Sequence, residues 1–167
     1  DYHHNELGIG ADGIDGVQNV IKNRELEGRL ELDHAAVATP LGVLTGTWGG
    51  QIGHRELGTA GNLGGLLAPT KTDTAAVFGF EQIQLTDTLK LQAAGRIEHH
   101  LVKGLAPSFP ADFLPPPDTF TEEAGRRSFA PKSVSVGVLK NLPWDMVATL
   151  TAQRVQRAPA APELYSR

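Results

Sequence analysis

The sequence predicts an all-β protein, an antiparallel meander of about seven strands that forms part of a transmembrane β-barrel. Three observations predict this class. Period-two alternation of polar and apolar residues recurs along the chain, no convincing helix separates the alternating stretches, and the connections between them alternate between long and short. Alternation of this kind gives a sheet one polar face and one apolar face.

The composition limits the other classes. The 167 residues carry a net charge of −4, so there is no basic footprint for nucleic acid, and we expect no nucleic-acid partner. The absence of cysteine excludes disulfides, thiolate metal sites and thiol nucleophiles. Nineteen glycines and eleven prolines favour turns and strands, and no run approaches the ~18 apolar residues of a membrane helix.

The clearest expected strand is Glu25–Asp33. Its charged residues alternate strictly with Leu26, Gly28, Leu30 and Leu32. A helix would scatter these charges around its circumference, whereas a strand gathers them on one face. The same reasoning, on weaker patterns, gives the full set of expected strands: residues 1–7, 25–33, 44–52, 75–81, 89–98, 133–138 and 144–153.

The connections between these strands fall into two classes. Short turns are expected near Thr39-Pro40, Thr86-Asp87 and Leu142-Pro143. Long loops are expected over three other stretches: Gly8–Asp15, Leu57–Asp73 and Lys103–Lys132. Strands that run up and down between two unlike ends produce this alternation, which is typical of outer-membrane β-barrels.

A soluble β-sandwich that acts as a ligand-binding module is the alternative, because its dry core produces the same alternation. Two features favour the membrane barrel. The polar face carries charge in strand after strand, and Trp144 is expected to begin a strand beside a short turn, where an interfacial aromatic girdle would place it.

The stretch GIGADG, residues Gly8–Gly13, matches the spacing of a dinucleotide phosphate loop. That motif requires a buried strand before it and a helix after it, whereas residues 1–7 are polar and a strand follows. We therefore interpret it as the tip of an outward loop. Asp12 and Asp15 offer carboxylates for calcium, but without the denser acidic loop that such a site requires.

Histidines are the candidate metal ligands. His3, His4, His54, His99 and His100 are expected at the long-loop ends of three strands, and His34 near a short turn. Neutral imidazole binds zinc, copper and haem iron, so their convergence at one rim predicts a metal site made by His4, His54 and His100. His100 is preferred to its neighbour because it shares the parity of Arg96 and Glu98. Solvated histidines with no ligand are the alternative.

No catalytic constellation is evident. The charged row from Glu25 to Asp33 is the pattern of a solvated lumen wall, the serines lack a nucleophile-elbow setting, and no H-E-x-x-H occurs. We expect that the protein is not an enzyme. The Pro- and Phe-rich stretch within Lys103–Lys132 is interpreted as a surface loop.

Several segments resemble the TonB-dependent outer-membrane receptors. Arg157-Ala158-Pro159 followed by Glu163-Leu164-Tyr165 is similar to that family's R-A-P-x-x-x-E-L-[FY] segment, with Pro162 as an unusual spacer. Leu91–Glu98 is similar to the L-x-x-G-x-R-x-E strand, and Phe129–Ser133 to the F-x-P-x-S strand opening. Residues 23–31 and 1–6 resemble strands of the zinc- and haem-type branch.

The resemblance implies a barrel of about 22 strands whose lumen is filled by an N-terminal plug. Seven strands cannot close even the ~8-stranded minimum, and neither a plug nor a terminal barrel strand is recognisable. We therefore expect residues 1–167 to be a middle part of a receptor barrel in the bacterial outer membrane. The implied function is uptake of a metal, a metal chelate or haem. The implied partners are outer-membrane lipid, the small metal-containing ligand, and a TonB-type energy-coupling protein that acts through the missing plug. No resident cofactor is certain, and zinc or haem iron would be cargo.

Overall fold

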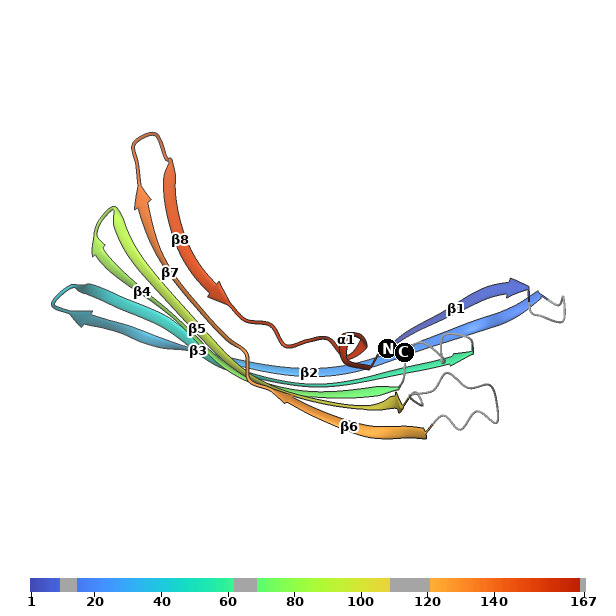
Figure 1. Cartoon of the computed structure of the whole chain (residues 1–167). Helices are drawn as coiled ribbons and strands as arrows, with labels where there is room; N and C mark the ends of the chain where they lie inside the picture. The colour runs from blue at the N-terminus through green and yellow to red at the C-terminus, as the bar shows by residue number, and fades with distance from the viewer. Residues whose placement is uncertain (10–14, 62–68, 109–120, 166–167) are drawn as a thin grey trace.

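The computed structural model describes residues 1–9, 15–61, 69–108 and 121–165. These residues form one antiparallel sheet and a single short helix (Figure 1). The elements are β1 (Tyr2–Ile9), β2 (Asp15–Thr39), β3 (Gly42–Gly61), β4 (Thr70–Thr86), β5 (Leu89–Ser108), β6 (Thr121–Phe129), β7 (Lys132–Asn141), β8 (Val147–Val155) and α1 (Ala161–Tyr165). The all-β prediction and the antiparallel meander are therefore confirmed.

The strands are longer than the sequence pattern predicted. The prediction of a long loop over Leu57–Asp73 is wrong at both ends of that range. Leu57 pairs with Thr70, β3 continues to Gly61, and β4 begins at Thr70. The same holds for Lys103–Lys132, which contains the end of β5 and the whole of β6. The tip of the GIGADG loop and residues 109–120 lie outside the described residues.

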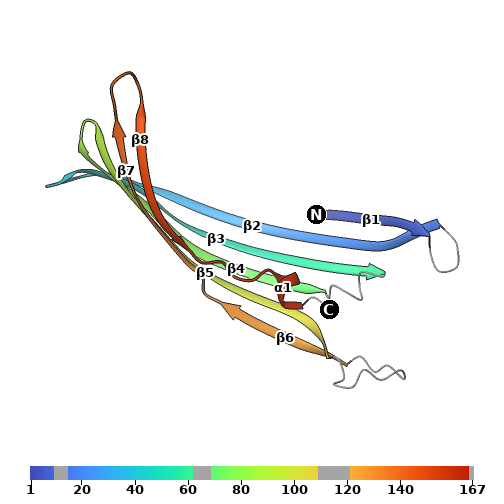
Figure 2. The same ribbon diagram turned by 45° about the horizontal axis from the view of Figure 1, so that its top comes forward.

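Strands β6 and β7 are two halves of one long strand that pairs with β5. Phe129 of β6 pairs with His100, and Lys132 of β7 pairs with Ile97. Pro131 lies at the break, where its carbonyl accepts a hydrogen bond of 3.0 Å from the Glu98 N–H. Because proline has no N–H to donate, the ladder is interrupted there. The ribbon changes direction at this point (Figure 2).

The expected strand over Trp144–Gln153 begins three residues later, at Val147. Trp144 and Asp145 have φ angles of 61° and 57°, which belong to a left-handed turn between β7 and β8. The Leu142 N–H closes this turn by donating to the Met146 carbonyl at 2.8 Å. Trp144 is therefore a turn residue, and its side chain is 87% exposed.

The sheet is curved, and its two faces differ in chemistry. The α1 segment lies on the concave side of the sheet (Figure 1). Register shows that this face is the charged one, because Val102 beneath α1 shares the parity of Arg96, Glu98 and His100. The convex face carries exposed apolar side chains in a band across the strands: Leu26, Leu30, Leu32, Trp48, Ile52, Val77, Ile97, Val134, Val136 and Leu150.

Burial within the chain is slight. Val102 is the one fully buried hydrophobic side chain among the described residues, and it packs against Leu105, Phe129, Ala161 and Leu164. Strands β1 and β8 lie at the two edges of the sheet, and no pairing between described residues closes it. The described residues therefore form an open single sheet whose apolar face is covered by no second layer.

Candidate functional site

The concave face carries an ordered row of charged and aromatic side chains across β2–β5. Phe78 of β4 lies between two guanidinium groups, with Arg29 Cζ 4.4 Å and Arg96 Cζ 5.5 Å from the centroid of its ring. The two arginines come from β2 and β5, so this stack links strands that do not pair with each other. Cation–π contacts of this kind contribute about 0.5–1 kcal/mol each at exposed sites.

Gly49 makes the stack possible. It is the β3 residue that pairs with Phe78, and it therefore lies between the phenyl ring and β2. A β-carbon at Gly49 would be 2.4 Å from Phe78 Cζ and 2.7 Å from the Leu30 carbonyl oxygen. The missing side chain allows the ring to cross β3 and reach Arg29.

Arg96 and Glu98 extend the network along β5. Arg96 forms an ion pair with Glu98, and its Nη2 donates to Gln51 Oε1 of β3 at 2.9 Å. His100 Nε2 lies 2.5 Å from the second carboxylate oxygen of Glu98. One carboxylate thus holds a guanidinium on one side and an imidazole on the other.

The C-terminal segment covers the end of this row. Ala158, Pro159, Ala160 and Ala161 line a small hollow of about 230 Å³ together with His100, other residues of the concave face and His54 of β3. Thr70, at 4% exposure, is buried in the same region. His100 therefore lines a partly open hollow between the sheet and the segment that follows β8.

Glu163 fixes the shape of this segment. Its Oε2 accepts the Ala160 N–H at 2.8 Å, and its Oε1 accepts a hydrogen bond from Arg157 Nη2 at 2.9 Å. A glutamate at the third helical position that reaches back to the N-cap amide is one half of a capping box. The Arg157 hydrogen bond and the Ala160 amide both lower the pKa of Glu163.

The structure does not bring the three predicted metal ligands together. His4 of β1 and His100 of β5 share the concave parity, but three strands separate them, which is about 19 Å along the sheet. His54 of β3 pairs with Leu26 and lies on the convex face. No group of three or more His, Asp or Glu residues suited to a metal ion occurs among the described residues.

His54 belongs instead to an ionic cluster on the convex face, beyond the apolar band of its strand. Its Nδ1 lies 2.6 Å from Asp73 Oδ1, and its Nε2 lies 3.4 Å from Glu56 Oε1. Hydrogen bonds from Asp73 and then Glu56 raise the pKa of His54. The His54 hydrogen bond lowers the pKa of Asp73, and Lys71, 2.6 Å from Glu56, lowers the pKa of that glutamate.

Sequence reasoning anticipated the charged row but missed the residues that organise it. Phe78, Gln51 and Gly49 were not singled out, because β4 shows little contrast between its two faces. The available signal was register: Gly49 pairs with Phe78, which pairs with Arg96. Of the two aspartates considered as calcium ligands near GIGADG, Asp12 lies outside the described residues and Asp15 is the first residue of β2.

Chemically, the concave face offers hydrogen-bond donors and acceptors together with aromatic surface, an arrangement suited to contact with a polar ligand or polypeptide. None of the helices in the described residues is long and apolar enough to cross a membrane. Comparison of the chain with protein-family models finds no match. Comparisons with curated proteins and with solved structures find none either.

Proposed function

We propose that the chain is a stretch of the wall of an outer-membrane β-barrel, from a TonB-dependent receptor that imports a metal, a metal chelate or haem. Its convex face contacts lipid and its concave face lines the lumen. The barrel wall binds and confines the cargo, and energy coupling acts through a plug in the lumen.

The observation that carries this proposal is the inverted polarity of a curved sheet. Apolar side chains cover the convex face and are left exposed, with Leu30 at 65%, Ile52 at 67% and Leu150 at 77%. A row of charged side chains crosses the concave face, where Arg96 is 29% and His100 22% exposed. A soluble sandwich buries its apolar face against a second sheet, whereas a membrane barrel turns it outward.

The slant of the apolar band supports the same conclusion. Pairing from strand to strand leads from Leu30 of β2 through Ile97 and Lys132 to Gln156, which follows β8. The apolar stretch of β8, however, is centred on Leu150, six residues before Gln156. Six residues of about 3.3 Å over five strand spacings of about 4.8 Å is a slant of roughly 40°. Strands in membrane barrels tilt by ≈ 35–45°.

The segments that resemble the receptor family also have distinct structural roles. Leu91–Glu98 lies in the centre of β5, and Phe129–Ser133 spans the proline break between β6 and β7. The segment from Arg157 to Tyr165 folds back over the concave face. In the proposed barrel this last segment projects into the lumen, where cargo or plug would meet it.

Detergent dependence tests the membrane assignment. We expect the chain to fold only in detergent micelles or bilayers and to aggregate in water, since its apolar face and two strand edges are exposed. Val136 and Ser135 are adjacent but lie on opposite faces, and they provide a matched pair. Val136→Lys is expected to reduce stability in a bilayer by about 2–4 kcal/mol and Ser135→Lys by much less. A chain that is monomeric and folded without detergent would overturn the proposal.

A further inference from the structure

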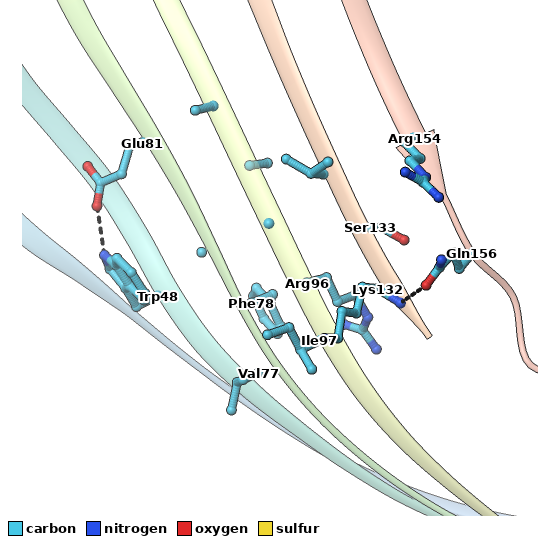
Figure 3. A pocket seen from close by; sticks show the side chains of 15 residues that line it. Trp48, Val77, Phe78, Glu81, Arg96, Ile97, Lys132, Ser133, Arg154 and Gln156 are labelled. Carbon is cyan, nitrogen blue, oxygen red and sulfur yellow. Dashed lines mark hydrogen bonds between the residues drawn. The ribbon is translucent and has the colours of Figure 1, made fainter. Parts of the chain in front are cut away.

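The convex face contains a shallow hollow in the middle of the apolar band. Its volume is about 700 Å³, and Val134 lines it. Its walls also include Trp48, Val77 and Ile97 (Figure 3). Register places Trp48, Gly79, Gly95 and Val134 in one row across four strands. The two glycines form its floor, because neither projects a side chain.

The two glycines contribute differently. The indole of Trp48 lies over Gly79, where an added β-carbon would be 3.1 Å from the ring. At Gly95 an added β-carbon would meet no atom within 4 Å. The hollow is therefore open above Gly95 and bounded by an aromatic ring on one side.

The polar residues around the hollow are distributed asymmetrically. Glu81 lies beside Trp48 and is held there, with its carboxylate accepting from Trp48 Nε1 at 2.7 Å and 3.0 Å from His34 Nε2. On the opposite side, the hollow is lined by Lys132 of β7 and Arg154 of β8 (Figure 3). Within the described residues, neither of these cations forms an ion pair.

The same asymmetry extends along the whole band. The strand ends opposite the short turns carry further cations on the convex face: Lys22, Arg24, Lys71, Lys103 and Arg126. The carboxylates of Asp1, Glu56 and Asp73 accompany them. At the short-turn ends of this face, Lys140 is the one lysine or arginine among the described residues. Cationic residues thus border one side of the apolar band.

We propose that this hollow is a binding site for an anionic membrane phospholipid. An acyl chain lies on the glycine floor beside Trp48, and the headgroup phosphate contacts Lys132 and Arg154. Charge complementarity favours an anionic headgroup, because two cations without a carboxylate partner lie next to an apolar surface. Guanidinium and ammonium groups are the usual protein partners of phosphate.

This inference rests on the proposed membrane location, and the experiment separates the two. The full chain with Trp144→Phe, so that Trp48 is the remaining tryptophan, is placed in phosphatidylcholine bilayers. Small mole fractions of phosphatidic acid or phosphatidylcholine with brominated acyl chains are then added. Bromine quenches indole fluorescence on contact, so quenching reports an acyl chain beside Trp48.

We expect phosphatidic acid to quench Trp48 more strongly than phosphatidylcholine, with a preference of about fivefold per cation. Lys132→Gln with Arg154→Gln removes this preference. Gly95→Leu, whose β-carbon would meet no atom within 4 Å, fills part of the hollow and weakens quenching by both lipids. Lys90→Gln with Lys140→Gln removes two cations at the short-turn ends and leaves the preference unchanged. Free inorganic phosphate does not compete, because the acyl chain contributes to binding.

Equal quenching by the two lipids in the parent chain would overturn the lipid site while the membrane location stands. Absence of quenching by either lipid would overturn the membrane location itself. A preference that survives Lys132→Gln with Arg154→Gln would show that other cations bind the headgroup, and would also overturn this site.

Discussion

The ring of Phe78 occupies the space above Gly49, where a β-carbon would lie 2.4 Å from Cζ of that ring. We expect Gly49→Val to displace the ring and lower the free energy of unfolding by about 1–3 kcal/mol, because the Leu30 carbonyl blocks retreat on the other side. Urea titration in detergent micelles measures this change. Gly95→Ala is the control and is expected to stay within about 0.5 kcal/mol of the parent chain.

Phe78 itself is expected to contribute through its two guanidinium neighbours. Phe78→Leu keeps most of the apolar area but removes both cation–π contacts, so we expect a loss of about 1–2 kcal/mol in the same titration. Phe80→Leu changes the same side chain two residues along the same face. Equal losses in the two variants would show that stacking with Arg29 and Arg96 contributes nothing.

Stability is expected to depend on pH through His54. Its pKa is raised above the ordinary 6.5 by Asp73 and Glu56, so protonation favours the folded state. The stabilisation is complete below pH 6.5 and is lost as the pH rises through the higher pKa of the folded state. Histidine resonances should show a pKa above 6.5 for His54, and Asp73→Asn should lower it. A parent pKa at or below 6.5 would contradict this prediction.

The carboxylate of Glu163 is expected to keep the segment after β8 closed. Glu163→Ala leaves the Ala160 amide without its acceptor and Arg157 without its partner. We expect local opening of this segment to become easier. Faster hydrogen exchange at Ala160 measures this. Glu163→Gln, which keeps an acceptor oxygen, should exchange at an intermediate rate.

His54 and His100 are expected to respond to zinc independently of each other. The two imidazoles lie on opposite faces of the sheet, so one ion cannot be held by both. In a zinc titration followed by histidine resonances, His100→Ala should therefore leave the response of His54 unchanged. A response of His54 that disappears in His100→Ala would contradict the arrangement of the sheet.

The sequence was sufficient for the parts of the fold in which side chains alternate in polarity. Glu25–Asp33 lies wholly within β2, and Leu89–Glu98 lies within β5, as expected. Strand β6 was missed because its sequence, TEEAGRRSF, shows no such alternation. It is a strand because its backbone pairs with β5, and this pairing cannot be read from the sequence of β6 alone.

The candidate site divides in the same way. Parity alone placed His100 on the same face as Arg96 and Glu98, and the Glu98–His100 contact agrees with that placement. The same parity puts His54 on the face of Trp48 and Ile52, and the register between β2 and β3 confirms that this is the apolar, convex face. The inclusion of His54 among the metal ligands was therefore an error that parity could have avoided. The left-handed turn at Trp144 was unpredictable, since residues other than glycine rarely adopt positive φ.

The near absence of an internal core has a consequence for what stability means in this chain. Val102 is the one hydrophobic side chain fully enclosed by the described residues, so folding does little to remove apolar area from the surroundings of the chain. In the proposed setting the folded state is one side of a partition equilibrium between water and lipid. A change in the acyl-chain length or headgroup of the lipid then changes the free energy of unfolding, just as an amino-acid substitution would. The stability of the chain is therefore a joint property of its sequence and of the surrounding bilayer.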